Sequence, residues 1–253
     1  MNFIGIIPAR YGSTRFPGKP LVDIIGKTMI RRVYERVKPV LDHIIVATDD
    51  ERIYNEVKGF GGNVIMTSPN HKSGTDRCAE ALSVYESLNP DKKPDVVINI
   101  QGDEPFVDVL QLSCLKSAFK RDEVDIATLV APITVPGDIF NPNCVKAVLS
   151  ASGNAIYFSR SPIPYIRAVP EQDWHKKHTY YRHIGLYAYR AEVLRELTAL
   201  APSPLETAES LEQNRWLENN YIISASVTAH ESPGIDTPED LDRVLVEFKD
   251  LLS

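Results

Sequence analysis

The sequence IIPARYGSTRFPGKP occupies residues 6–20, and the rest of the chain is interpreted outward from it. It begins inside a short apolar run that starts at Phe3, and a segment with helical spacing follows it. The stretch contains the cations Arg10, Arg15 and Lys19 and no acidic residue. A basic loop between a strand and a helix is typical of phosphate binding. An ordinary connector with solvated charges is the alternative, but the prolines that stiffen both ends favour a binding loop.

Short apolar strands alternate with helical patterns through the first hundred residues. We expect strands at residues 3–7, 43–48, 64–66 and 95–100. Helical spacing is found at residues 29–37, 53–57 and 73–85. This alternation predicts the α/β class, with a mainly parallel central sheet and helices on both faces. Ligands in such sheets bind at the carboxyl ends of the strands, where the basic loop also lies.

The second half of the sequence is less regular. It suggests strands at residues 125–131, 145–149, 154–158, 184–189 and 222–227. Helices are expected at residues 191–200, 205–219 and 237–252. The strands at 145–149 and 154–158 are close enough to form a hairpin. We therefore expect one α/β domain over residues 1–253, with a smaller inserted lobe around 135–190.

Composition restricts the partners. The formal net charge of -6 and the isoelectric point near 5.6 argue against a nucleic-acid groove. A small anionic ligand remains compatible, because local cations can bind it within an acidic protein. The three cysteines are far apart, which favours reduced thiols. No signal peptide and no membrane-spanning apolar run is found. We expect a cytoplasmic protein with no nucleic-acid or membrane partner.

Several common motifs fail on spacing. A Walker A loop would need glycine at position 13 and a hydroxyl residue after Lys19, where the sequence has Ser13 and Pro20. A dinucleotide fingerprint at Gly59 and Gly61 fails because position 64 is valine. The sequence has no His/Cys cluster for zinc and no Gly-x-Ser-x-Gly elbow. These observations disfavour P-loop hydrolysis, nicotinamide binding, zinc chemistry and serine hydrolysis.

Two aspartates follow strands. Asp103 lies in QGDEP at residues 101–105, after the fourth strand, and Asp236 lies in GIDTP at 234–238, before the last helix. Carboxylates suit Mg²⁺, which usually takes one or two of them together with phosphate and water. Helix capping is the alternative at both positions. His183, with Tyr187 and Tyr189, shares one face of a strand, a pattern found more often in cores than in sites.

Taken together, these stretches resemble a known family. Residues 7–20 resemble the signature of the sugar-acid cytidylyltransferases. Later stretches resemble the members of that family that use 3-deoxy-manno-octulosonate (Kdo). In chain order they are SGTDR (73–77), QGDEP (101–105), FNPN (140–143), YFSR (157–160), RHIGLY (182–187), SPLE (203–206), LEQ (211–213) and GIDTPEDL (234–241). Phe16 in place of the usual Leu, and Gly12 in place of the common Ala, remove no charged group.

The resemblance implies the nucleotide-diphospho-sugar transferase fold, which is Rossmann-like, and a reaction. The anomeric hydroxyl of Kdo would attack the α-phosphate of CTP, giving CMP-Kdo and pyrophosphate, with Mg²⁺ required. It also implies a cytosolic homodimer that serves lipopolysaccharide synthesis. The same chemistry on another acid sugar, such as a sialic acid, is the nearer alternative. A non-catalytic nucleotide-binding protein is the more distant one.

The resemblance also implies roles for individual residues. Lys19, Arg10 and Asp103 would be catalytic, with Lys19 stabilising charge on the α-phosphate and the leaving pyrophosphate. The nucleotide would be bound by Ala9, Arg10, Arg15, Lys19, Ser73, Gly74, Arg77 and Gln101. The sugar would be bound by Gln101, Arg160, His183, Tyr187, Glu212 and Gln213. Asp103 and Asp236 would hold the metal. Arg160 suits the Kdo carboxylate because a guanidinium can bind it through two hydrogen bonds.

Overall fold

The computed structural model describes residues 1–12, 16–230, 234–235 and 237–247. The chain divides into two compact units. Unit 1 comprises residues 1–113, 190–198 and 231–253, and unit 2 comprises residues 114–189 and 199–230. The sequence-based division into one domain with a lobe around 135–190 stays a prediction.

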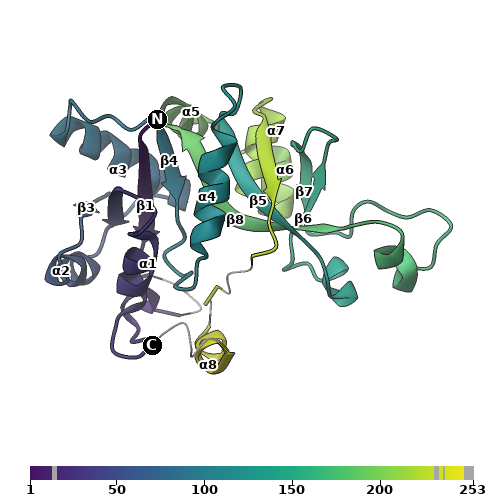
Figure 1. Ribbon diagram of the computed structural model, residues 1–253, viewed down its shortest axis with the longest axis horizontal. Helices are drawn as coiled ribbons and strands as arrows, with labels where there is room; N and C mark the ends of the chain where they lie inside the picture. Colours follow the sequence, from purple (N-terminus) through teal and green to yellow (C-terminus); the bar gives the residue numbers. More distant parts are fainter. Residues whose placement is uncertain (13–15, 231–233, 236, 248–253) are drawn as a thin grey trace. The chain divides into compact units, whose positions relative to one another are not determined.

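Unit 1 is built on a parallel sheet. Its described strands are β1 (Phe3–Ala9), β2 (His43–Thr48), β3 (Val64–Met66) and β4 (Val96–Asn99). They lie in the order β3-β2-β1-β4 (Figure 1). Almost every apolar side chain of β1, β2 and β4 is buried. This explains why these strands are continuous apolar runs, and it confirms the predicted parallel sheet.

The helices of unit 1 include those that connect its strands. They are η1 (Lys19–Leu21), α1 (Met29–Val37), α2 (Glu51–Gly59), α3 (Gly74–Leu88), α4 (Val109–Ala118), α5 (Ala191–Ala199) and α8 (Pro238–Glu247). The longest of these, α3, contacts all four strands. Asp50 caps α2 by accepting a hydrogen bond from the Arg52 amide. The sequence did not predict α4, which begins in unit 1 and ends in unit 2.

Unit 2 has a mixed sheet. Its strands among the described residues are β5 (Ile126–Pro132), β6 (Lys146–Leu149), β7 (Ala155–Ser159), β8 (Tyr181–Arg190) and β9 (Ile223–Val227). β5 pairs antiparallel with β8 and parallel with β9. β6 and β7 form the expected antiparallel hairpin, and β6 also pairs with β8. The sheet of unit 2 therefore differs from the all-parallel sheet of unit 1.

The predicted single helix at residues 205–219 is wrong. The structure has two helices there, α6 (Pro204–Glu209) and α7 (Glu212–Glu218). Ser210 ends α6 in the left-handed region with φ 52°, and Leu211 begins α7. Helical periodicity continues across such a break, so the sequence pattern did not reveal it. The break places Glu212 in the first turn of α7.

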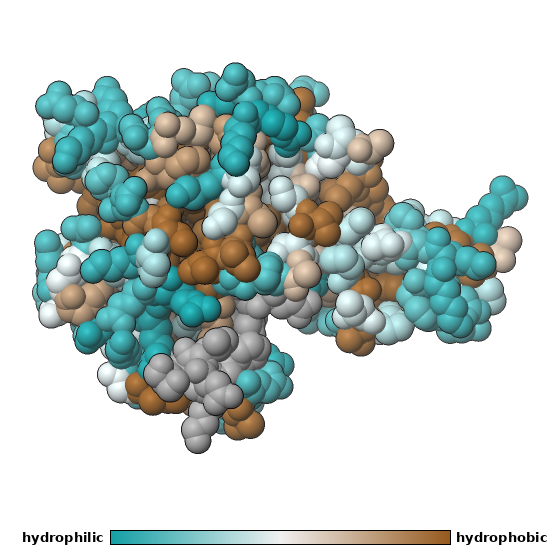
Figure 2. All heavy atoms as spheres, in the orientation of Figure 1, coloured by the Kyte–Doolittle hydropathy of each residue, from teal (hydrophilic) through white to brown (hydrophobic). Residues whose placement is uncertain are grey.

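Residues 161–180 form a long excursion between β7 and β8. The segment contains η3 (Glu171–Lys176), and Trp174 and Tyr180 form a small buried cluster with Ile139 of η2 (Pro136–Ile139). Tyr165 is 72% exposed beside this cluster. Figure 2 shows apolar atoms among hydrophilic ones where the excursion projects at the right of the view. Across the described residues, no helix combines the length and hydropathy needed to cross a bilayer.

Candidate functional site

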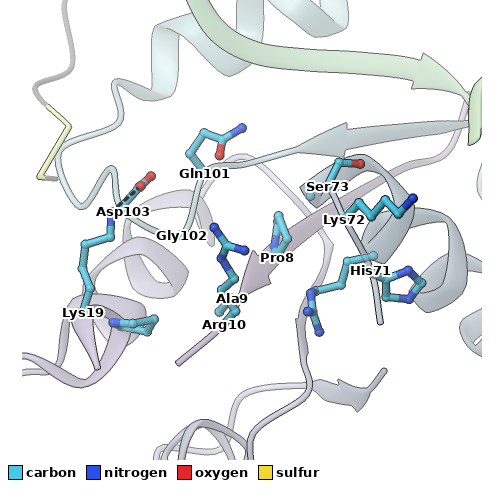
Figure 3. Close-up of a pocket in the computed structure, with 13 residues that line it drawn as sticks. Pro8, Ala9, Arg10, Lys19, His71, Lys72, Ser73, Gln101, Gly102 and Asp103 are labelled. Carbon is cyan, nitrogen blue, oxygen red and sulfur yellow. Dashed lines mark hydrogen bonds and ion pairs between the residues drawn. The ribbon is translucent and has the colours of Figure 1, made fainter. Parts of the chain in front are cut away.

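A cavity of about 250 Å³ lies in unit 1, at the carboxyl ends of β1 and β4 and beside the start of α3 (Figure 3). It is lined by Pro8, Ala9, Arg10, Lys19, Pro20, His71, Lys72, Ser73, Gly74, Arg77, Gln101, Gly102 and Asp103. Loops that follow parallel strands meet at one edge of a sheet, so residues far apart in the sequence converge there.

The cavity includes most of the residues assigned to the nucleotide. Within the described part of the chain, every predicted nucleotide-binding residue lines it, and so does Asp103. Arg15 lies outside the described residues. His71 and Lys72 line the cavity but were not predicted. Because both directly precede Ser73, extending the predicted motif by two residues would have found them.

The cavity is locally basic although the whole chain is acidic. Its lining contains Arg10, Lys19, Lys72 and Arg77 and a single carboxylate, Asp103. In Figure 3, Lys19 and Asp103 lie at one end, and the residues that open α3 lie at the other. Such a concentration of positive charge suits a polyanion such as a nucleotide triphosphate.

Lys19 and Asp103 form an ion pair across the cavity. Lys19 Nζ lies 2.6 Å from Asp103 Oδ2. The Lys19 side chain is only 11% exposed, and its ammonium group is held in place by Asp103. The lysine is the first residue of η1, and the aspartate follows β4. A phosphate oxygen or a metal ion entering the cavity would therefore compete for a pair that already exists.

The start of α3 supplies further donors. Ser73 caps the helix by accepting from the Asp76 amide, and the Asp76 side chain accepts from the Ser73 amide. The buried Arg77 donates to Thr67 Oγ1 at 2.7 Å and to Asp49 Oδ2 at 2.9 Å. Arg77 thus ties the loops after β2 and β3 to the helix. The helix N-terminus adds partial positive charge to the same end of the cavity.

Gly102 allows a close approach between two strand ends. A Cβ at this position would lie 2.8 Å from the Pro8 carbonyl oxygen, closer than real Cβ atoms come. A side chain at 102 would therefore separate the end of β1 from the loop after β4. With glycine, Gln101 and Asp103 stay beside Ala9 and Arg10 around one cavity.

The loop before α3 is fixed by Glu80. The Glu80 carboxylate accepts a hydrogen bond from the Ser68 amide at 2.9 Å and contacts His71 Nε2. Burial alone would raise the pKa of Glu80, but these two partners lower it overall. A charged Glu80 holds His71 at the rim of the cavity, next to Lys72 and Ser73.

Of the two predicted metal ligands, only Asp103 is among the residues that the structure describes. No group of three or more His, Cys, Asp or Glu side chains with metal-binding geometry is found among the described residues. Asp236 lies outside them. Its neighbour Ile235 donates its amide to the Asp103 carbonyl at 3.0 Å. The capping hydrogen bonds at the start of α8 are made by Thr237 and Asp240. One carboxylate beside a phosphate-sized cavity fits Mg²⁺ chemistry, which uses few protein ligands.

The residues predicted to bind the sugar lie in unit 2, apart from Gln101. His183 Nε2 lies 3.1 Å from Thr128 Oγ1, and Thr128 Oγ1 donates its proton to the Leu186 carbonyl at 2.9 Å. Burial lowers the pKa of His183 to about 3, so the ring is neutral, with one nitrogen that donates and one that accepts a hydrogen bond.

Tyr187 lies beside His183 on β8, with ring centroids 5.3 Å apart. Burial and then the Glu212 carboxylate raise the pKa of Tyr187 well above its usual range, against a smaller opposing effect of Thr128. The buried Tyr187 hydroxyl has no partner of ordinary hydrogen-bond geometry in the described part of the chain. A buried hydroxyl of this kind gains from a polar ligand.

Arg160, Glu212 and Gln213 lie around the break between α6 and α7. Arg160 donates through Nε to the Glu209 carbonyl at 2.7 Å and through Nη1 to the Pro142 carbonyl at 3.0 Å. Arg215 holds Glu212 at 3.2 Å, and Gln213 is buried. A longer third bond joins Arg160 Nη2 to the Ser210 carbonyl at 3.5 Å, and two of the five guanidinium N–H donors remain beyond these three bonds.

Comparison with known proteins agrees with this arrangement. A cytidylyltransferase family model matches residues 4–226. A 3-deoxy-manno-octulosonate cytidylyltransferase of Parabacteroides distasonis is 57% identical over 249 residues, covering 97% of each chain. The enzyme of the same name from Bacteroides thetaiotaomicron is also 57% identical, covering 95% of this chain and 96% of the relative. The solved structure of a CMP:2-keto-3-deoxy-manno-octonic acid synthetase complexed with CTP is 40% identical, with a TM-score of 0.90, and covers 99% of this chain and 100% of its own. The resemblance predicted from the motifs is thereby confirmed.

Proposed function

The chain belongs to the cytidylyltransferase family, among its 3-deoxy-manno-octulosonate cytidylyltransferases, and from this membership we propose that it transfers CMP from CTP to Kdo. It is accordingly a nucleotidyltransferase. The anomeric hydroxyl of Kdo forms the new bond to the α-phosphate, and the bond to pyrophosphate breaks. The observation that carries the proposal is the basic cavity at the carboxyl ends of β1 and β4.

CTP is the substrate assigned to this cavity. Arg10 and Lys19 bind the triphosphate, together with Arg15. The base and ribose lie toward the other end, against Ala9, Ser73 and Gly74, with Gln101 and Arg77 beside them. Phosphoryl-type transfer asks the protein mainly to position the substrates and to stabilise charge, so cations matter more than a general base.

Lys19 acts at the bond that breaks. When the triphosphate enters, its oxygens compete with Asp103 for the lysine. Lys19 then stabilises the charge that develops on the α-phosphate and the leaving pyrophosphate. The Asp103 carboxylate, no longer paired with Lys19, would then be available to hold a metal ion.

The metal proposed for the reaction is Mg²⁺, held by Asp103 and Asp236. When bound, Mg²⁺ neutralises phosphate charge and lowers the pKa of a coordinated sugar hydroxyl. The support is the donor chemistry of the two carboxylates and the hydrogen bond between Ile235 and Asp103.

Kdo is the substrate assigned to the predicted sugar residues. Its carboxylate binds Arg160, whose planar fork matches a carboxylate. Its hydroxyls bind His183, Tyr187 and Glu212, with Gln213 adding an amide group. The neutral His183 ring can donate one hydrogen bond and accept another, and the Tyr187 hydroxyl can also take part in binding.

The cellular setting follows from the product. CMP-Kdo is an activated sugar for lipopolysaccharide synthesis, and we assign the enzyme to the cytoplasm as a homodimer. Exposed apolar side chains at Val135, Ile156 and Tyr165 of unit 2 suit contact with a second copy. Sedimentation velocity tests the dimer. A single species at the monomer mass would overturn this assignment.

Pyrophosphate release on mixing the protein with CTP, Mg²⁺ and Kdo tests the function. We expect release only when all three are present. Replacing Kdo by a sialic acid separates the nearer alternative, and greater release with that sugar would overturn the Kdo assignment. CTP binding without release under any of these conditions would favour a non-catalytic nucleotide-binding protein.

A further inference from the structure

Tyr11 and Gly18 bracket the basic loop of unit 1 and are joined directly. The Gly18 amide donates to the Tyr11 carbonyl at 3.0 Å. Gly18 has a φ of 73°, in the left-handed region that favours glycine. A Cβ at Gly18 would lie 3.0 Å from Cζ and from the hydroxyl oxygen of Tyr11. The hydroxyl-bearing end of the Tyr11 ring therefore lies close to Gly18, and a larger residue at 18 would displace it.

A second element holds the outer face of the same ring. The guanidinium carbon of Arg52 lies 3.3 Å from the centroid of the Tyr11 ring, within the range of a cation–π contact. Arg52 belongs to the first turn of α2, which follows β2. The contact thus links the loop after β1 to the helix after β2, at the carboxyl edge of the sheet.

Asp50 fixes Arg52 in this position. Arg52 Nε donates to Asp50 Oδ1 at 2.9 Å, and Nη2 donates to Oδ2 at 2.6 Å. This two-point pairing orients the guanidinium plane. Hydrogen bonding to Asp50 raises the pKa of Arg52, so the cation over the ring stays charged. Asp50 itself is held by its role as the cap of α2.

Tyr11 and Gly18 are adjacent in sequence to two of the cations that line the cavity. Arg10 precedes Tyr11, and Lys19 follows Gly18, and both line the cavity. Neither Tyr11 nor Arg52 lines it. The chain of contacts from Asp50 to Gly18 therefore acts on the spacing of the two cations without touching the cavity.

We propose that Tyr11 and Arg52 are positioning residues that hold Arg10 and Lys19 at the spacing required to bind the triphosphate of CTP. The inference rests on the proposed function for its choice of ligand. We name this set of contacts, from Asp50 through Arg52 and Tyr11 to Gly18, the tyrosine clamp.

Three variants and one matched control test the clamp. Arg52→Met removes the cation from a side chain that is 58% exposed, so the fold should persist. Tyr11→Leu removes the ring, whereas Tyr11→Phe keeps it. The control is Arg31→Met, because Arg31 is also paired with a carboxylate, Glu35, and lies over a ring, Phe60, but does not line the cavity.

We expect Arg52→Met and Tyr11→Leu to raise the KM for CTP by about two- to fivefold, the range expected for losing an exposed cation–π contact. The KM for Kdo should stay unchanged. Tyr11→Phe and Arg31→Met should match the wild type for both substrates. An unchanged KM for CTP in folded Arg52→Met and Tyr11→Leu would overturn the proposal, and so would an equal rise in Arg31→Met.

Hydrogen exchange of the Gly18 amide tests the tyrosine clamp independently of the enzymatic reaction. The Gly18 amide should exchange faster in Tyr11→Leu than in the wild type, whether or not the enzyme accepts Kdo. If the wild type releases no pyrophosphate but Gly18 exchange responds in this way, the proposed function fails and the clamp contact stands. If Gly18 exchange is unaffected by Tyr11→Leu, the clamp is overturned even in an active enzyme.

Discussion

Lys19 Nζ lies 2.6 Å from Asp103 Oδ2, so the proposed phosphate-binding cation and the proposed metal-binding carboxylate form one ion pair. We expect Lys19→Met to lower kcat on the order of a hundredfold or more, because a charge-stabilising donor is lost at the bond that breaks. Pyrophosphate release at saturating CTP and Kdo measures this. A near-normal kcat in a variant with unchanged thermal unfolding would remove Lys19 from the catalytic role.

The same pair predicts coupling between its two partners. Asp103→Asn should raise the Mg²⁺ concentration needed for half-maximal rate. In the double variant, the losses in kcat/KM should not add, because each single change already disrupts the shared interaction. Strictly additive losses in a double-mutant cycle would mean that the two residues act independently.

Asp236 is expected to affect metal dependence and not folding. Thr237 and Asp240 exchange capping hydrogen bonds at the start of α8, and we expect these bonds to maintain the cap when Asp236 is replaced. Asp236→Ala should therefore raise the Mg²⁺ requirement and leave the melting temperature unchanged. Thr237→Ala is the matched control, and it should cost about 1 kcal/mol of stability, as lost N-caps do. A lower melting temperature in Asp236→Ala with unchanged Mg²⁺ dependence would restore the capping interpretation.

Periodicity predicted the sheet of unit 1 because its strands are short, largely buried and separated by amphipathic helices. The same reasoning placed the residues around the cavity, since motifs at the ends of parallel strands must converge. Helix α4 was missed because its sequence, VLQLSCLKSA, distributes apolar residues around the whole helix. A helix without an apolar stripe gives no periodic signal.

The sequence patterns did not predict the tertiary contacts. The break at Ser210 depends on a single left-handed residue that interrupts no pattern. The roles of Glu80 and Arg52 depend on side chains meeting across loops, which spacing alone does not predict. The residues of the sugar site came from family resemblance and not from chemistry readable in the sequence, because an aromatic strand face such as that of β8 is also typical of a core.

His183 predicts a dependence of stability on pH. Burial lowers the pKa of His183 to about 3 in the folded state, against an ordinary value near 6.5 when unfolded. Between these values the unfolded chain binds more protons, so stability falls as the pH drops below about 6.5. The slope from this residue is at most about 1.4 kcal/mol per pH unit.

Urea unfolding at pH 7, 6 and 5 measures this effect. His183→Gln should lose less stability on acidification than the wild type, because glutamine does not titrate. His175→Gln, at an exposed position of η3, should behave as the wild type does. Parallel pH profiles for His183→Gln and the wild type would show that His183 is protonated alike in both states.

The hydrogen bonds of Lys146 support the backbone near the residues proposed to bind Kdo. Its side chain is buried, and its Nζ donates to the carbonyls of Asn141, Cys144 and Arg160 at 2.6 to 2.8 Å. Burial lowers the pKa of Lys146, but these three acceptors satisfy all three of its N–H donors. Lys146→Met would remove three buried hydrogen bonds donated by a charged group and should destabilise the protein by about 3 kcal/mol or more.

We expect Lys146→Met to affect the binding of Kdo and not that of CTP. Because the Arg160 carbonyl is one of the three acceptors, loss of Nζ frees the backbone that carries the proposed Kdo carboxylate ligand. The KM for Kdo should therefore rise in Lys146→Met at temperatures where the variant is folded, with the KM for CTP unchanged. Lys177→Met, at an exposed position of unit 2, should alter neither stability nor either KM. Equal changes in both KM values would mean that Lys146 supports the fold in general and not the sugar residues in particular.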